Sequence, residues 1–160
     1  MKSKEHNKEI FVLLHNIRSL LNVGSVFRTA ESLGATKIYI SGYTGTPEHP
    51  RLAKTALGAE SFMDWKYVKS PKRIIDQLKK EHPKLEVIGL ENNLKHNKPV
   101  SLVKFKPRFP LLLVLGEEVG GIQKNLLPLC DKFVEIPMLG KKESLNVAVA
   151  FGIAMFELSK

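Results

Sequence analysis

Three segments of the chain carry residues whose types and spacing could do chemistry. The first, HNIRSLLNVGSVFRTAESLGA (15–35), holds two asparagines and two arginines: Asn16, Arg18, Asn22 and Arg28. A guanidinium binds phosphate through a planar fork, and a side-chain amide both donates and accepts hydrogen bonds. Arg28 follows Phe27 on an apolar stripe. The aliphatic part of its side chain is therefore expected to pack, while its guanidinium group reaches a functional site. The alternative is a solvated arginine on an amphipathic helix.

The second segment, LLLVLGEEVGGIQ (111–123), is a buried strand that runs into a glycine-rich turn. Ligands of open α/β sheets bind where strands end in this way. The turn has neither the Gly-Lys-Ser/Thr of a phosphate loop nor the GxGxxG spacing of a dinucleotide site. Glu117 and Glu118 would repel a phosphate, so a neutral or cationic ligand is expected. Alternatively, the glycines only permit a tight turn.

The third segment, FVEIPMLGKKESLNVAVAFGIAMFE (133–157), is a strand that ends at Ile136 and Pro137, followed by a loop and a helix. Proline cannot extend a strand ladder, so the chain must turn there. Ser144 is predicted to cap the helix, with Asn146 in its first turn. Backbone groups exposed at the strand end could bind the edge of a purine; the alternative is ordinary helix capping.

The elements around these segments predict an α/β fold with a mainly parallel sheet flanked by helices. Short, β-branched apolar runs alternate with helical patterns, and their continuous hydrophobicity indicates burial on both faces. The predicted strands are Ile10–Leu14, Lys37–Ile40, Glu86–Leu90, Leu111–Leu115 and Phe133–Ile136.

Helices are predicted between these strands. They cover Val23–Leu33, capped by Asn22 and closed by Gly34; a segment from Pro71, capped by Ser70; Gly121–Leu129; and a last helix from about Ser144. Two segments lack periodicity. Gly42–Pro50 is predicted to be a long loop, and Asn92–Pro110 a basic, irregular or edge-strand region.

Length and charge narrow the class of protein. A chain of 160 residues is expected to form one domain, and 25 Lys+Arg against 16 Asp+Glu (net +9) favours a polyanionic partner. The single cysteine, Cys130, excludes an intramolecular disulfide framework and leaves no metal-ligand spacing. No apolar run approaches the roughly 18 residues of a membrane span. We therefore predict a cytoplasmic protein without a metal.

The three segments, in this order, resemble the three motifs of the SpoU/TrmH branch of the SPOUT RNA methyltransferases. The motifs read Asn22-Val-Gly-Ser-Val-Phe-Arg28, Leu115-Gly116-Glu117-Glu118-Val-Gly-Gly121, and Ile136-Pro-Met138 through Ser144-Leu-Asn146. The resemblance implies a single SPOUT domain over residues 1–160 with a deep C-terminal trefoil knot and no appended RNA-binding domain. It also implies a homodimer that uses S-adenosyl-L-methionine to methylate a ribose 2′-hydroxyl of tRNA or rRNA.

The same resemblance assigns roles to residues. It implies a catalytic role for Arg28, as a base or as an anchor for the adjacent phosphate, with Asn22, Glu118, Ser144 and Asn146 building the site. Cofactor contacts are implied for Leu90, Gly116, Ile136, Met138 and Leu145. Plausible RNA phosphate contacts are Arg18, with Asn16 beside it, and Arg51, supported by the basic stretch from Lys95 to Arg108.

Two other functions remain open from the sequence. A non-catalytic RNA-binding module could keep the knotted fold, although it would have no reason to retain Asn22 and Arg28. A flavodoxin-like or nucleotide-binding regulator is disfavoured by the third motif and by the missing phosphate-loop spacing. The sequence does not indicate which RNA or which nucleotide is modified.

Overall fold

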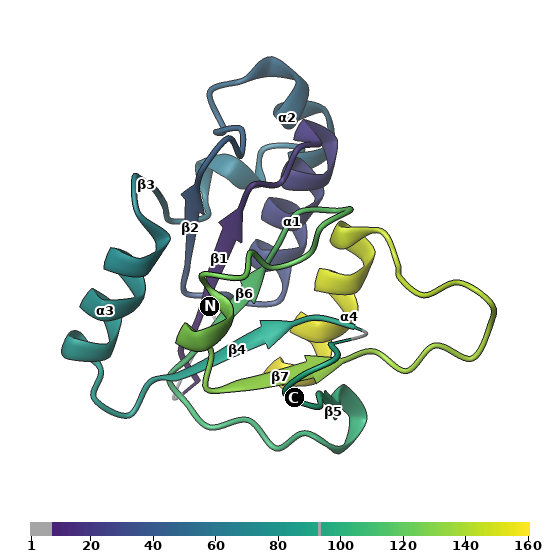
Figure 1. Cartoon of the computed structure of the whole chain (residues 1–160). Coiled ribbons are helices and arrows are strands. Elements are labelled where there is room, and N and C mark those ends of the chain that lie inside the picture. The colour runs from purple at the N-terminus through teal and green to yellow at the C-terminus, as the bar shows by residue number, and fades with distance from the viewer. Residues whose placement is uncertain (1–7, 93) are drawn as a thin grey trace.

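A seven-stranded sheet, in which every strand pairing is parallel, organises the described part of the chain. The computed structural model describes residues 8–92 and 94–160, so residues 1–7 and Asn93 lie outside it. The strand order is β3-β2-β1-β6-β4-β7-β5 (Figure 1). The strands are β1 (Ile10–His15), β2 (Lys37–Ser41), β3 (Trp65–Val68), β4 (Glu86–Leu90), β5 (Val100–Ser101), β6 (Leu111–Leu115) and β7 (Lys132–Glu135).

Helices cover both faces of this sheet. Figure 1 shows α3 (Pro71–Glu81) on one side and α1 (Leu20–Ser32) and α4 (Val147–Ser159) on the other. A short helix, α2 (Pro50–Ala56), packs beside α1. Single 3-10 turns lie at Ala59–Ser61, Leu102–Lys104 and Leu127–Leu129. No helix in residues 8–92 and 94–160 combines the length and apolarity that a membrane span requires.

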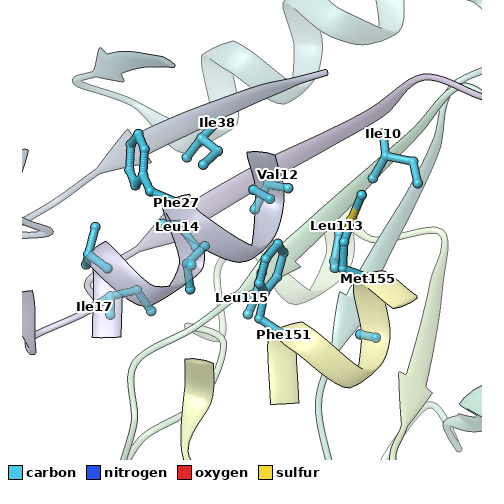
Figure 2. Close-up of a cluster of buried hydrophobic side chains, with 14 of the residues drawn as sticks. Ile10, Val12, Leu14, Ile17, Phe27, Ile38, Leu113, Leu115, Phe151 and Met155 are labelled. Carbon is cyan, nitrogen blue, oxygen red and sulfur yellow. The ribbon is translucent and has the colours of Figure 1, made fainter. Parts of the chain in front are cut away.

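The predicted burial of the strands on both faces is confirmed. Alternate residues of β1 enter different clusters because side chains of a strand point alternately to its two faces. Val12 and Leu14 pack with Phe27 of α1 and Phe151 of α4, as Figure 2 shows. Phe11 and Leu13 pack on the other face with the apolar side of α3.

The predicted strands are confirmed to within one residue at either end, but several helix boundaries differ. The first helix begins at Leu20 instead of Val23, because Ser19, not Asn22, is its cap: the Ser19 hydroxyl accepts the N–H of Asn22. The last helix begins at Val147, and its cap is Asn146 rather than Ser144. Asn146 therefore precedes the first turn instead of lying in it.

One predicted helix is absent. Gly121–Leu129 forms turns and the short 3-10 helix Leu127–Leu129. Gly121 has a left-handed φ of 69°, and Pro128 lacks the N–H that an α-helix would use there. The predicted long loop is confirmed up to His49, where α2 follows. In the Asn92–Pro110 region, the described residues form the two-residue edge strand β5 and one 3-10 turn and are otherwise irregular. The structure adds α2 and β3, which the sequence analysis did not predict.

Candidate active site

A cavity of about 290 Å³ lies where β4, β6 and β7 end and α4 begins. All five residues predicted to contact a cofactor line it, although they come from four segments of the chain. Glu118 and Ser144 line it as well. The lining consists of Leu90, Glu91, Asn92, Leu115, Gly116, Glu117, Glu118, Val119, Gly121, Ile136, Met138, Glu143, Ser144, Leu145, Val147 and Ala150.

The glycine-rich turn after β6 forms one wall of the cavity. Glu117 and Gly121 exchange two backbone hydrogen bonds, of 3.1 and 2.9 Å, which close the turn. A Cβ on Gly116 would lie 2.3 Å from the backbone of Gly121 and Ile122. Close backbone contact thus requires glycine at position 116, and the left-handed φ favours it at position 121.

Glu91, directly after β4, holds this turn through a hydrogen bond. Its Oε2 accepts the N–H of Ile122 at 2.8 Å, and a Cβ on Gly121 would lie 2.2 Å from the same oxygen. Burial raises the pKa of Glu91, and backbone donors at Ile122 and Asn92 offset part of that rise. Glu91 was not predicted from the sequence, although polar residues that directly follow a buried strand are a recognisable signal.

Asn92 ties the end of β4 to the exit of β7. Its amide nitrogen donates to the carbonyl of Ile136 at 3.1 Å, and its amide oxygen accepts the N–H of Ile136 at 3.3 Å. The N–H of Ile136 is therefore paired within the chain, whereas its carbonyl oxygen keeps a second lone pair that a ligand could use.

A polar cluster beside the cavity joins the three sequence motifs. Glu118 accepts the backbone N–H groups of Arg18 and Ser19, each at 3.1 Å, and the amide of Asn22 at 3.4 Å. Asn146 donates to Asn22 at 3.1 Å, while its own Oδ1 caps α4. Asn22, Glu118 and Asn146 thus come together in space, although 124 positions separate Asn22 from Asn146.

The charge of Glu118 is stabilised by these donors. Burial alone would raise the pKa of this carboxyl, but the N–H groups of Arg18 and Ser19 and the Asn22 amide outweigh it and hold the pKa below its ordinary value. Glu118 is therefore ionised at neutral pH and serves as an acceptor that fixes the start of α1. This arrangement suits a structural carboxylate better than one that transfers protons.

Asn16 and Arg18, both predicted near RNA, occupy different environments. Asn16 is 8% exposed, has a left-handed φ of 58°, and accepts the N–H of Tyr43 at 3.1 Å, so its side chain shapes a turn. Arg18 is exposed and lines a shallow depression that adjoins the cavity. Tyr43, missed by the sequence analysis, lies there too and donates to Glu117 at 2.8 Å.

Arg28 does not reach the cavity within one chain. It is exposed and lines a separate depression between α1 and α2. Neighbouring Phe27 is fully buried on the apolar stripe, whereas Arg28 is exposed. Arg51 is also exposed, at the start of α2, where its N–H donates to the capping His49.

Solved structures with this fold include two methyltransferases. The SpoU methyltransferase AviRb from Streptomyces viridochromogenes, in complex with the cofactor AdoMet, is 27% identical with a TM-score of 0.85, over 94% of this chain and 59% of that one. An AdoMet-bound rRNA methyltransferase from Sinorhizobium meliloti is 25% identical with a TM-score of 0.82, and the match covers 94% of this chain and 55% of that one.

Curated relatives show the same similarity. The 23S rRNA (guanosine-2'-O-)-methyltransferase RlmB of Xylella fastidiosa is 30% identical over 148 residues, 92% of this chain and 57% of the relative. RlmB of Vibrio parahaemolyticus is 27% identical over 153 residues, which cover 96% of this chain and 60% of the relative. The chain thus spans about three fifths of the length of these relatives. Because the SpoU rRNA Methylase family model matches residues 9–156, the chain belongs to this family.

Proposed function

We propose that the protein is an S-adenosylmethionine-dependent RNA 2′-O-ribose methyltransferase that acts on tRNA or rRNA. The observation that carries the proposal is the convergence of all five predicted cofactor residues on one cavity, next to the Asn22–Glu118–Asn146 cluster. Family membership supports it, as do the names of relatives that methylate rRNA. The net charge of +9 suits a polyanionic substrate.

The lining of the cavity fits this cofactor. Among the lining residues that the structure describes, the charged ones are four glutamates, Glu91, Glu117, Glu118 and Glu143, and none is a lysine, arginine or histidine. Such a wall favours a sulfonium cation and disfavours a phosphate. Apolar contacts are available from Leu90, Leu115, Ile136, Met138 and Leu145. S-adenosylmethionine, when bound, supplies an electrophilic methyl group.

The residues of the chain would then orient the nucleophile. A ribose hydroxyl is a weak nucleophile that must be aligned with the methyl group and relieved of its proton. Arg28 would hold the adjacent phosphate with its planar fork and orient the hydroxyl, because a guanidinium is a poor base. Asn22, Glu118 and Asn146 would fix the start of α1, on which Arg28 is carried.

A second copy of the chain would complete this site. Arg28 lies outside the cavity, and none of the described residues that line the cavity carries a positive charge. Helix α4, which adjoins both regions, leaves an apolar stripe exposed: Val149 (52%), Ile153 (39%) and Phe156 (55%). Within α4, Gly152 lies against Thr29 of the Arg28 depression. We propose a homodimer across this stripe, so that Arg28 of one subunit serves the cavity of the other.

The activity is tested by incubating unmodified tRNA and rRNA with isotope-labelled S-adenosylmethionine and analysing the nucleosides by mass spectrometry. A labelled 2′-O-methyl nucleoside is expected with the wild type, and its base identifies the target nucleotide. Arg28→Ala is expected to lower the rate by roughly 100-fold or more, with unchanged cofactor affinity. Cofactor binding without any label transfer to RNA would contradict the proposed activity.

Subunit mixing tests whether Arg28 acts on the partner's cavity. Arg28→Ala retains an intact cavity, and Gly116→Val retains Arg28 while filling the cavity wall. If Arg28 acts across the dimer, co-refolded mixtures regain up to about half of the wild-type activity per heterodimer, since one of its two sites is complete. If each subunit is self-sufficient, the mixture stays inactive.

A non-catalytic RNA-binding module is the second candidate. It is disfavoured by the retention of Asn22 and Arg28 together with a cavity suited to the cofactor. Binding of RNA without binding of S-adenosylmethionine would support it. The trefoil knot and the cytoplasmic location stay predictions. The knot is supported by family membership and by a strand order in which β6 lies between β1 and β4.

A further inference from the structure

The depression that contains Arg28 has the chemistry of an anion site. It measures about 500 Å³ and is open to solvent. Its lining combines a guanidinium, an ammonium group and four hydroxyl groups, and it includes no carboxylate. The lining residues are Ser25, Arg28, Thr29, Ser32, Lys54, Thr55 and Leu57.

The two cations of this depression are unpaired. Five other lysines of the described residues hold a carboxylate within 4 Å: Lys37, Lys72, Lys79, Lys132 and Lys160. Within residues 8–92 and 94–160, neither Arg28 nor Lys54 has an ion-pair partner. Both side chains are exposed. They are therefore available to a phosphate without breaking an existing contact.

The packing of α1 against α2 sets the positions of Arg28 and Lys54 relative to each other in the depression. A Cβ on Gly24 would lie 2.1 Å from Thr55 Oγ1 and 2.3 Å from the carbonyl of Leu52, so only glycine allows this approach. The hydroxyl of Thr55 donates to the carbonyl of Leu21 at 2.7 Å, which ties the helices together. Lys54 directly precedes Thr55, and Arg28 lies one turn beyond Gly24. Their relative position is thus set by the backbone.

We propose that Lys54, with Arg28, forms a binding site for a phosphodiester of the RNA backbone in the depression between α1 and α2. The inference rests on the proposed RNA methyltransferase function and adds a substrate contact to it. Arg28 offers a planar fork that orients a phosphate, whereas Lys54 offers a point charge. Lys54 therefore contributes mainly to RNA affinity, and Arg28 to affinity and rate.

The test compares RNA binding by the full chain and three variants, using a pool of unmodified tRNA transcripts and 23S rRNA fragments over a range of salt concentrations. Lys54→Ala is expected to weaken binding by roughly 3- to 10-fold near 0.1 M salt and to lower the slope of log K against log salt by about one. Lys54→Arg is expected to stay within about twofold of the wild type, since charge is the property required. Cofactor affinity and Tm should be unchanged.

The matched control is Lys80→Ala, which removes an exposed lysine from α3 on the opposite face of the sheet. If Lys54→Ala matches Lys80→Ala in affinity and slope while the wild type binds RNA and transfers methyl groups, the Lys54 site is wrong and the proposed function stands. If Lys54→Ala weakens binding but the wild type transfers no methyl group, the site stands and the function fails. A wild type that binds no RNA overturns both.

Discussion

The cavity and the α1–α2 depression differ in the structural elements that line them and in the sign of their charged residues. The cavity wall consists of strand ends and a glycine turn held by backbone hydrogen bonds, and its charged residues are all acidic. The depression is lined by side chains projecting from two helices, and its charges are both positive. The difference indicates a division of tasks in which a rigid acidic wall suits a small cation, and an open basic surface suits a flexible polyanion.

The largest expected effect on cofactor affinity comes from a change in the cavity wall. Gly116→Ala places a Cβ 2.3 Å from the Gly121 backbone, which cannot move without opening the turn. An overpacking cost of about 1–3 kcal/mol corresponds to a loss of cofactor affinity of roughly 5- to 150-fold. Calorimetry with S-adenosylmethionine measures this loss, and filter binding should show unchanged RNA affinity.

Gly140→Ala is the matched control for this change. A Cβ at position 140 would meet nothing within 4 Å, and the φ angle of Gly140 is not left-handed. Cofactor affinity should therefore stay at the wild-type value. If both variants bind the cofactor equally well, the glycine turn does not form the binding wall, and the contrast between the two regions fails.

The sequence predicted the cavity better than the depression for a physical reason. The cavity is assembled by strand ends, and parallel strands bring their carboxyl ends to one edge whatever the intervening sequence. The family resemblance implied that Leu90, Gly116 and Ile136 share a site, and the buried apolar runs predict the strands at whose ends these residues lie. The hydrogen bonds that Glu91 and Asn92 make to the cavity wall depend on the register between β4 and its neighbouring strands. This register cannot be read from the sequence.

The depression depends on how two helices cross, and the sequence carried little signal for it. Helix α2 has only seven residues and begins with a proline within a segment of turn-forming residues, so its periodicity is too short to detect. The cap of α1 was misassigned because Ser19 and Asn22 are both strong caps; packing of Leu20 against the core favours the earlier start. Edge strand β3 was missed because its exposed residues break the apolar pattern.

A change to the polar cluster between the two regions should have an intermediate effect. Glu118→Gln removes the charge that accepts the N–H groups of Arg18 and Ser19. Because Glu118 is exposed, the free energy of unfolding should fall only modestly, by about 1 kcal/mol, which lowers Tm by roughly 2–4 °C. Glu31→Gln, on the exposed face of α1, is the control and should leave Tm unchanged.

The pH dependence of this effect has a definite sign. The folded state holds the pKa of Glu118 below its ordinary value of 4.5. The carboxylate therefore stabilises the fold fully above that value, and the stabilisation is lost as pH falls through the lower folded pKa. The Tm difference between wild type and Glu118→Gln should be largest near neutral pH and shrink in acid. A difference that grows in acid would show that Glu118 is not stabilised as an anion.

The smallest effect is expected where the cavity meets the Arg18 depression. Tyr43→Phe removes the hydroxyl that donates to Glu117 at 2.8 Å, yet Glu117 also accepts the N–H of Gly120 at 3.2 Å, so the carboxylate keeps a partner. The tyrosine ring is 53% exposed and contributes little burial. Cofactor affinity should change by less than about threefold and stability by less than about 0.5 kcal/mol. A tenfold loss of cofactor affinity would mean that Glu117 must be oriented by Tyr43, and that the acidic wall depends on a side chain as well as on the backbone.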